Sequence, residues 1–483
     1  MQRLKVTVSC PSCGAPIEFL EGSNVSCCPF CNLPLFFQSP EKVLSYYLES
    51  KLSQREIPFI VDRFRKEQEQ PLSSKIQDIK LYYLPFWRFS TQVFYSRVNL
   101  TFLAPQQEEK EVEILTKDWD TNFPAHLSND LGLVTLGMRP DWLKLRLLTD
   151  LNCLKQGQIL DLETNPSEAR EKALRGLDFL MQSKKSAEDE LILKLLDENL
   201  SLIYFPLWVV NFITEEEKYY QVIDGVVKRT LLQKPGYFDL RLNEKKENKP
   251  SYTLKIIPHR CPNCGADFKV ADFHLVFPCD NCRKIWRISE QGYQPVQGEL
   301  VAPSGEKIKA QSKSIEYYPF WVFEASPQKE KNFNIEKLAE LFPSEIGWFM
   351  AKDKSRPFLF YIPAFEIKNL NKIPSISLAF TRIQPQLEEK NREQEKLQGA
   401  IRSDEDAKKL AELLWLGLLY SKMNLDVDEW KDLNFGNAKI IWYPFQQEGA
   451  FLTDLFAGYS FQKASWGQNP PEADSVPTFF STP

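Results

Sequence analysis

The sequence Cys10-Pro-Ser-Cys13-Gly14, followed by Cys28-Pro-Phe-Cys31, recurs as Cys261-Pro-Asn-Cys264-Gly265, followed by Cys279-Asp-Asn-Cys282. In both copies, 14 residues separate the two cysteine pairs. Two cysteines three positions apart on a tight turn can direct both sulfurs at one ion, and two such turns complete a tetrahedral site with four sulfur ligands. We therefore predict two zinc ribbons, each holding one structural Zn²⁺. The predicted metal ligands are Cys10, Cys13, Cys28, Cys31, Cys261, Cys264, Cys279 and Cys282.

The same cysteines could also form disulfides or bind iron. Disulfides are disfavoured because nothing in the sequence points to an oxidising compartment. Iron bound as in rubredoxin would use the same four ligands, so the spacing alone leaves zinc and iron open. His259 lies two residues before Cys261, but four cysteines already fill that site. We expect the two remaining cysteines, Cys27 and Cys153, to be small buried apolar residues.

The residue after each knuckle is expected to adopt a turn conformation. Gly14 and Gly265 follow the second cysteine of their pairs, where glycine tolerates the turn and lets backbone N–H groups approach sulfur. Asn32 and Arg283 occupy this place in the second knuckles. Asn accepts a positive φ readily and Arg less so, which predicts a small weakness in the second site.

A second repeat combines tyrosine, proline and tryptophan. Its copies are short apolar runs rich in aromatic residues, and such runs predict buried strands. A proline inside a strand demands an edge position or a bulge. We expect the alternating stretches 93–100 and 222–229 to supply hairpin partners. The copies are Tyr82–Trp87, Tyr204–Trp208, Tyr317–Trp321, Tyr361–Phe365 and Trp442–Phe445.

Four helices are predicted from their starts. Asn165-Pro166 with Glu168 combines an N-cap, a proline at N1 and an acid at N3, with Ala169, Ala173, Leu177 and Leu180 on one face. Ser39-Pro40 opens a similar pattern through Leu48, and Ser186 and Ser403 give two more capped starts. The polar segment Gln386–Lys396 is expected to be an exposed helix or linker.

The order of motifs indicates a tandem duplication. From the first cysteine of each ribbon, successive proline motifs lie 75, 114 and 196 residues on in one half and 58, 102 and 183 in the other. The nearly constant deficit predicts one deletion, and we expect the helix opened by Ser39 to be the missing element. The predicted fold is α+β: two four-cysteine zinc ribbons with antiparallel hairpins and helices. The predicted parts are ribbon 1 (1–38), the first repeat half (39–250), ribbon 2 (251–300), the second half (301–466) and a disordered tail (467–483).

The net charge and the distribution of apolar residues argue against some classes of protein. The chain of 483 residues carries a net charge of −5, which argues against a protein dedicated to coating nucleic acid. Neither a signal peptide nor a stretch of 18 apolar residues is visible in the sequence. We therefore expect a cytoplasmic protein. The oligomeric state cannot be predicted from these features.

The cysteine sets and the motifs ending at Trp87, Trp208 and Trp321 resemble a group of bacterial double zinc-ribbon proteins. These proteins are described as having ribbons of the transcription-factor-IIB type, and some are likened to primosomal helicases. Related proteins often carry transmembrane helices and accompany membrane-stress scaffolds. The resemblance implies an adaptor. A helicase activity is not expected, since the chain has no G-x-x-x-x-G-K-[ST] loop.

Sequence patterns of catalysis are missing as well. The chain contains no H-E-x-x-H, G-x-S-x-G or G-x-G-x-x-G motif. His126, His259 and His274 are isolated in the sequence, and Asp118, Asp120 and Asp130 are expected to be solvated loop carboxylates or caps. The prediction is a non-enzymatic scaffold that presents a protein-interaction surface, with a membrane-stress or large cytosolic assembly as the expected kind of partner.

The alternative is a nucleic-acid-binding module. Basic residues outnumber acids around the second ribbon, and aromatic residues lie among them. Ribbons can bind nucleic acid through such a face. The candidate residues are Arg260, Lys269, Arg283, Lys284, Trp286 and Arg287.

Overall fold

The structure is a computed structural model. It describes residues 4–38, 43–68, 74–104, 107–126, 129–136, 144–148, 154, 157–182, 191–214, 217–239, 255–270, 273–289, 291–303, 315–330, 332–342, 353–392, 395, 397–420, 426–456 and 458–462. The chain divides into two compact units. One comprises residues 1–91, 119–183 and 198–258, and the other comprises residues 92–118, 184–197 and 259–483. Both contain strands and helices, which confirms the α+β class.

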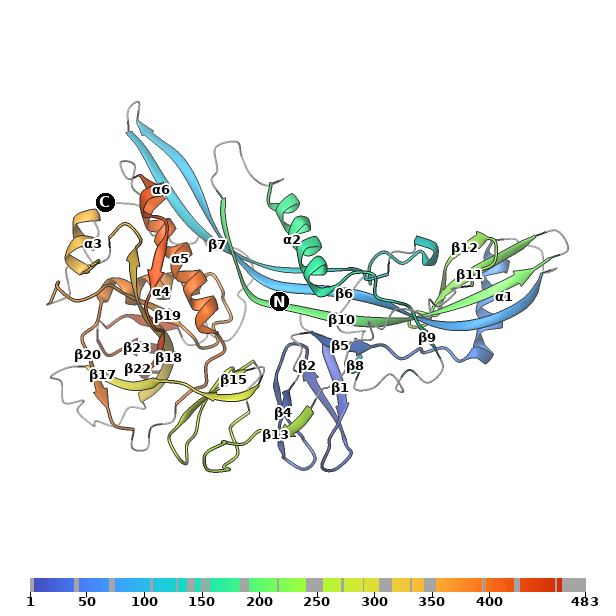
Figure 1. The fold of residues 1–483 in the computed structure, drawn as a ribbon, viewed down its shortest axis with the longest axis horizontal. Coiled ribbons are helices and arrows are strands. Elements are labelled where there is room, and N and C mark those ends of the chain that lie inside the picture. The colour runs from blue at the N-terminus through green and yellow to red at the C-terminus, as the bar shows by residue number, and fades with distance from the viewer. Residues whose placement is uncertain are drawn as a thin grey trace. The chain divides into compact units, whose positions relative to one another are not determined.

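The first unit is built on a large sheet that includes part of the first ribbon (Figure 1). Its main path runs β12 (Arg229–Pro235), β11 (Lys218–Asp224), β10 (Leu191–Ile213), β5 (Leu44–Tyr47), β8 (Leu145–Leu147), β1 (Lys5–Ser9) and β2 (Pro16–Leu20). Three further strands join it: β6 (Lys75–Ala104), β7 (Gln107–Pro124) and β9 (Gln158–Ile159). The parts of β6 and β7 within residues 92–118 belong to the second unit. A separate small sheet joins β3 (Val25–Cys27), β4 (Pro34–Gln38) and β13 (Lys255–Pro258).

Helix α2 (Pro166–Gln182) begins where the sequence predicts. Asn165 and Glu168 exchange bonds, each backbone N–H donating to the other's side chain at 2.9 and 3.0 Å. This reciprocal capping box fixes the helix start. Ala169, Ala173 and Leu177 are buried as predicted, but Met181 completes the buried face in place of the partly exposed Leu180.

The predicted helix opened by Ser39 is wrong. Residues 39–42 lie outside the described residues, and Leu44–Tyr47 form strand β5, which is parallel to β10 and antiparallel to β8. The helix of this region is α1 (Ile57–Glu67), preceded by the short 3₁₀ helix η1 (Gln54–Glu56) and a capping box on Ser53. Between β5 and β6 the chain has 27 residues, against 11 between β17 (Gly298–Pro303) and β18 (Ile315–Pro327). Helix α1 lies in the longer of these two segments.

The second unit has an eight-stranded sheet with helices packed on it (Figure 1). Its main path runs β19 (Leu359–Pro363), β18 (Ile315–Pro327), β22 (Lys439–Glu448), β17 (Gly298–Pro303) and β20 (Leu387–Lys390). The shorter strands are β21 (Leu433–Phe435), β23 (Phe451–Asp454) and β24 (Ser460–Gln462). The helices are α3 (Ile335–Leu341), α4 (Lys372–Ile383), α5 (Asp404–Tyr420) and α6 (Val427–Trp430). The second ribbon adds β14 (Val276–Pro278), β15 (Ile285–Ser289) and β16 (Gly292–Pro295).

All five Tyr-Pro-Trp stretches contribute to strands, in β6, β10, β18, β19 and β22. The expected edge position is wrong for Pro319, because β18 has partners on both sides. Pro319 instead lies where the β18–β19 ladder ends. There its carbonyl accepts the N–H of Ala364 at 2.9 Å. A proline fits at this point because it still supplies an acceptor where its missing donor is not needed.

The two halves repeat one set of hydrogen bonds around these prolines. Ala125 N–H donates to Pro85 O at 2.8 Å, as Ala364 N–H does to Pro319 O. Ala125 O then accepts from Glu163 N–H at 3.0 Å, and Ala364 O accepts from Ile401 N–H at 2.7 Å. In each half the next residues lead directly into a long helix, α2 or α5.

Several other expectations need correction. Residues 93–100 continue β6 and are not a separate hairpin partner. The expected hairpin partner is confirmed for residues 222–224, where β11 pairs with the Tyr204–Trp208 stretch of β10, and the chain then turns into β12. The helix expected after Ser186 is wrong from residue 191 on, where β10 begins, and residues 183–190 lie outside the described residues. In the polar segment 386–396, residues 387–390 form strand β20, paired with β17. The expected disordered tail, 467–483, also lies outside the described residues.

Helix α5 and its N-cap are confirmed, with Ser403 Oγ accepting the N–H of Asp406 at 3.1 Å. None of the helices in the described parts of the chain is long and apolar enough to span a membrane.

Candidate metal centres

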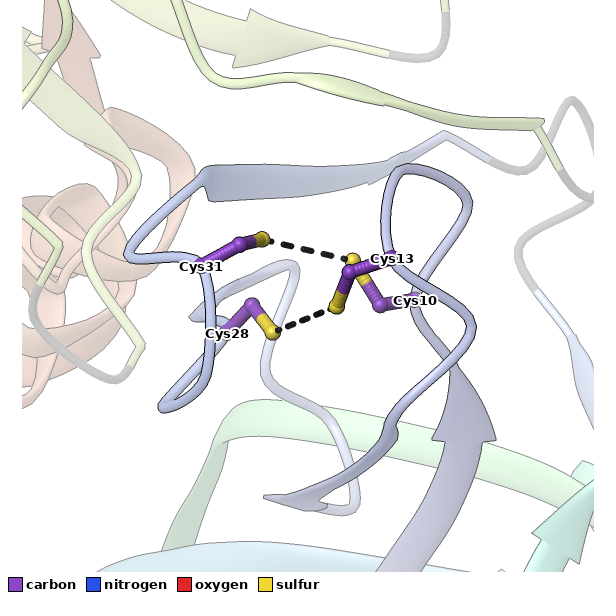
Figure 2. Close-up of side chains that lie close together, drawn as sticks. All are labelled: Cys10, Cys13, Cys28 and Cys31. Atoms are coloured by element: carbon purple, nitrogen blue, oxygen red, sulfur yellow. Dashed lines mark hydrogen bonds between the residues drawn. The ribbon is translucent and has the colours of Figure 1, made fainter.

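The four cysteines of the first ribbon converge on one point (Figure 2). Cys10 and Cys13 lie on the loop between β1 and β2, and Cys28 and Cys31 lie on the loop between β3 and β4. The Sγ atoms of Cys10 and Cys31 are 3.8 Å apart, and those of Cys13 and Cys28 are 3.7 Å apart. All four sulfurs lie within 4.8 Å of one another.

The second ribbon repeats this arrangement. The Sγ atoms of Cys261 and Cys282 are 3.5 Å apart, as are those of Cys264 and Cys279. A tetrahedron of sulfurs around an ion at a Zn–S distance of about 2.3 Å has edges of about 3.8 Å. A disulfide would bring two sulfurs to about 2.05 Å. Both sets therefore have the dimensions of a metal site and not of disulfides.

Backbone hydrogen bonds shape the four knuckles alike. In the first knuckle of each ribbon, Gly14 N–H donates to Cys10 O and Gly265 N–H donates to Cys261 O, both at 2.9 Å. The φ angles of Gly14 and Gly265 are 74° and 73°. Asn32 and Arg283 take the same left-handed conformation in the second knuckles, with φ of 56° and 65°. A long side chain at Arg283 thus occupies a conformation that favours glycine or asparagine.

The thiols within each cluster differ in pKa. In the first site, burial opposes ionisation of Cys28, but N–H bonds from Cys31 and Phe30 outweigh it and lower its pKa to about 7. In the second site, the N–H of Ala266 and the side chain of Asn281 lower the pKa of Cys264 to about 6. Burial and neighbouring thiols raise the pKa of Cys279 to about 12. A cation at the centre would replace the shared protons and let all four thiols ionise.

Cys27 and His259 lie outside the clusters. Cys27 is exposed, so the expectation that it is buried is wrong; β3 ends at Cys27, opposite Pro34. Cys153 lies outside the described residues. His259 is fully buried, contacts the rings of Phe268 and Phe277, and hydrogen-bonds through Nδ1 to Tyr293 Oη. Burial lowers the pKa of His259 to about 4.

The second ribbon is bound to the segment of its own unit that lies between β20 and α5. Val276 and Ala400 form a β-bridge in which Ala400 N–H donates to Val276 O at 3.1 Å. The preceding Gly399 leaves no space for a side chain, because a Cβ there would lie 2.3 Å from His274 Nδ1. Arg392, just beyond β20, donates to Cys279 O at 3.0 Å and to Asp280 Oδ1 at 2.6 Å. The polar segment after β20 is therefore bound to the knuckle.

Most of the candidate nucleic-acid residues have local partners. Arg260 pairs with Asp267 at 2.8 Å, and Lys269 pairs with Asp280 at 2.5 Å. Lys284 donates to Asn263 at 2.7 Å. Arg287 pairs with Asp404 at 3.3 Å and, with Glu405 and Trp321, borders a cavity of about 330 Å³. Arg283 supplies the turn after Cys282, and Trp286 is partly buried in β15.

Sequence reasoning missed a buried ionic cluster in the first unit. Arg88, in β6, pairs with Glu21, next to β2, and with Asp120, in β7; the side chains of Arg88 and Glu21 are each 1% exposed. Ser201 Oγ donates to Glu21 Oε1 at 2.6 Å. The cluster joins the ribbon hairpin to the long strands. Nothing in the spacing of these residues signals the contact, because they lie far apart in the sequence.

The aspartates and histidines singled out in the sequence do not gather into one site. The expectation of a loop carboxylate is wrong for Asp118 and Asp120, which lie in strand β7. Asp130 pairs with Lys234 at 3.3 Å, and Tyr220 Oη donates to its carbonyl. His126 Nδ1 lies 3.1 Å from Asp161 O.

Comparison of the chain with protein-family models, with curated proteins and with solved structures found no match.

Proposed function

We propose that the protein is a non-enzymatic scaffold whose two four-cysteine centres each hold a structural Zn²⁺. The observation that carries this proposal is the convergence of four thiols in each centre. Four sulfur ligands complete a tetrahedral shell and leave no open position for a substrate or an activated water. Zinc is the metal proposed, since it is the usual partner of a closed four-cysteine ribbon, and iron is the alternative.

The mechanism proposed is presentation of a fixed surface. A small hairpin has too little core to fold alone, and metal binding supplies the missing free energy. In the first unit, the ribbon strand β1 pairs in parallel with β8, and β4 pairs with β13. In the second unit, the bridge between Val276 and Ala400 has the same role. Metal binding in this account fixes the knuckle loops on rigid sheets, where a partner protein contacts them.

The two halves are proposed to be tandem duplicates. Support comes from the matched knuckle bonds, the matched bonds at Pro85 and Pro319, and the helices that follow them. The resemblance to bacterial double zinc-ribbon proteins supports an adaptor role. We propose a cytoplasmic location and a partner in a membrane-stress or large cytosolic assembly.

Nucleic-acid binding is the second candidate. It rests on the density of basic residues in the second ribbon. The pairing of Arg260, Lys269 and Arg287 with carboxylates argues against it, because each pair already neutralises one charge that a phosphate would need.

A pull-down of the tagged full chain, with and without nuclease, separates the two candidates. The scaffold predicts a discrete set of proteins that survives nuclease and disappears when zinc is removed by Cys28→Ser with Cys264→Ser. Loss of all partners on nuclease treatment would contradict the scaffold. In that case, variants at Lys284 and Arg287 should weaken binding of a short duplex and lower its salt dependence.

A further inference from the structure

The two metal centres differ in what holds the second knuckle. In the second site, the guanidinium of Arg392 donates through Nη1 to Cys279 O and through Nη2 to Asp280 Oδ1. Its Nε donates to Glu395 O at 3.4 Å, and the side chain is only 10% exposed. One largely buried guanidinium therefore connects a cysteine ligand to the segment that follows β20.

The first site lacks this connection within the described parts of the chain. Cys28, which corresponds to Cys279, receives the N–H of Asn32 at its carbonyl at 2.9 Å, as Cys279 receives that of Arg283 at 3.0 Å. Among the described residues, the side-chain group that reaches Cys28 O is the weak donor Sγ of Cys27, at 3.8 Å. The ligands also differ in exposure. Cys31 is exposed, whereas its counterpart Cys282 is partly buried.

The left-handed φ of Arg283 weakens the second knuckle slightly. Two physical effects of Arg392 act against this weakness and strengthen the second site. A centre of four thiolates with Zn²⁺ has a net negative charge, because four thiolates outweigh one divalent cation. A largely buried guanidinium on the carbonyl of a ligand favours the charged state, and the ion pair with Asp280 offsets part of this effect. In addition, releasing the ion requires the Cys279–Cys282 knuckle to move, and the two bonds of Arg392 oppose that movement. Residues that hold ligands from outside the coordination shell typically change metal affinity by about 10–100-fold.

Other basic side chains of the second ribbon can affect the metal centre only through their charge. Arg260, Lys269 and Lys284 lie on the surface of the ribbon and each contacts an acid or amide there. Exposed pairs of this kind contribute little. Arg392 differs because its side chain is largely buried and because it contacts the backbone of a ligand.

We infer that Arg392 is a positioning residue for the second metal centre and that the two centres are unequal: the second retains its metal, and the first exchanges it more readily. This inference rests on the proposed function, since it requires both centres to bind zinc. Under it, changes in metal supply would act on the first ribbon before the second.

Chelator-driven zinc release from the full, zinc-loaded chain tests the inference. With a colorimetric chelator in excess, we expect two kinetic phases of one zinc each. Cys264→Ser should leave only the fast phase, and Cys28→Ser only the slow phase. Arg392→Gln should accelerate the slow phase about 10-fold and leave the fast phase unchanged. Arg392→Lys, which keeps the charge but has a single donor nitrogen, should restore part of the difference.

Arg356→Gln is the matched control. Arg356 lies in the same unit as the second ribbon and donates to the main-chain carbonyl of Gln384 at 2.8 Å, and neither residue belongs to a ribbon. It should not change either phase. Equal release from both centres, an unchanged slow phase in Arg392→Gln, or the same acceleration in Arg356→Gln would each overturn the inference. Those outcomes leave two bound zinc ions and the proposed function intact, whereas a chain that binds no zinc would contradict the proposed function itself.

Discussion

The indole N–H of Trp321 donates a 2.8 Å hydrogen bond to the carbonyl of Arg402, the residue immediately before the N-cap of α5. Trp87 makes the corresponding bond, 3.1 Å long, to Thr164, the residue before the N-cap of α2. In each half, therefore, the tryptophan of the strand motif fixes the start of the long helix. The Tyr-Pro-Trp motif joins a strand to a helix as well as filling the core.

Replacing Trp321 by Phe should lower the free energy of unfolding by about 1–3 kcal/mol, because the buried carbonyl of Arg402 would lose its partner. Denaturant unfolding of the zinc-loaded chain measures this. Trp286→Phe is the control, since the Trp286 indole N–H has no hydrogen-bond partner among the described residues. Equal destabilisation by the two variants would show that the hydrogen bond does not matter.

Arg88→Met should destabilise the first unit strongly. The substitution leaves the carboxylates of Glu21 and Asp120 without their cation, and Glu21 is almost completely buried. Breaking a buried ion pair from one side costs about 3–5 kcal/mol. Adding Glu21→Gln should recover part of the loss, as a double-mutant cycle would show. Strictly additive losses would contradict the coupling of these residues.

Gly399→Ala should loosen the second ribbon. The added Cβ would lie 2.3 Å from the His274 ring and 2.8 Å from Val276 O, so the bridge between Val276 and Ala400 must shift. We expect a loss of about 1–3 kcal/mol, typical of overpacking. Gly176→Ala, in α2, is the control. Its Cβ has room and should stabilise the helix by about 0.5–1 kcal/mol.

Stability should fall in mild acid partly through His274. Burial lowers the pKa of His274 from 6.5 to about 4. The unfolded chain therefore binds more protons than the folded one between these values. The contribution is fully present above pH 6.5 and is lost as the pH falls toward 4. His274→Gln should flatten the pH dependence of unfolding in this window, measured as the difference from the parent chain. An unchanged slope would contradict the assignment.

The choice between Cys27 and Cys28 can be tested directly. Cys28→Ser should reduce bound zinc from two ions per chain to one, because Cys28 supplies a ligand of the first cluster. Cys27→Ser should leave both ions in place, since Cys27 belongs to neither cluster. Equal metal loss from the two variants, measured by elemental analysis, would overturn the ligand assignment.

The metal ligands could be predicted because they are local. A C-x-x-C turn forms from four successive residues, and the repeated spacing identifies Cys28 over Cys27. The capped helices α2 and α5 were predictable for the same reason, since Asn165 and Ser403 act on neighbouring backbone. The Tyr-Pro-Trp stretches read correctly as strands because aromatic and β-branched residues favour that state.

The errors involve pairing over long sequence distances. The sequence of Leu44–Tyr47 resembles one turn of an amphipathic helix. In the structure it is a strand, because it pairs with residues 201–204 of β10. The segment around Arg392 looks solvated from its composition, and only the folded chain brings it to Cys279. The same holds for Arg88 and Glu21. The conformation of these segments depends on contacts with residues far away in the sequence. The local sequence pattern carries no information about those contacts.

Native mass spectrometry of the purified full chain tests the central claim most directly. The account predicts one species whose mass exceeds that of the reduced chain by two zinc ions, corrected for the protons that they displace, with no mass loss from disulfides. A chain that carries no metal, or one whose clustered cysteines are oxidised to disulfides, would contradict it.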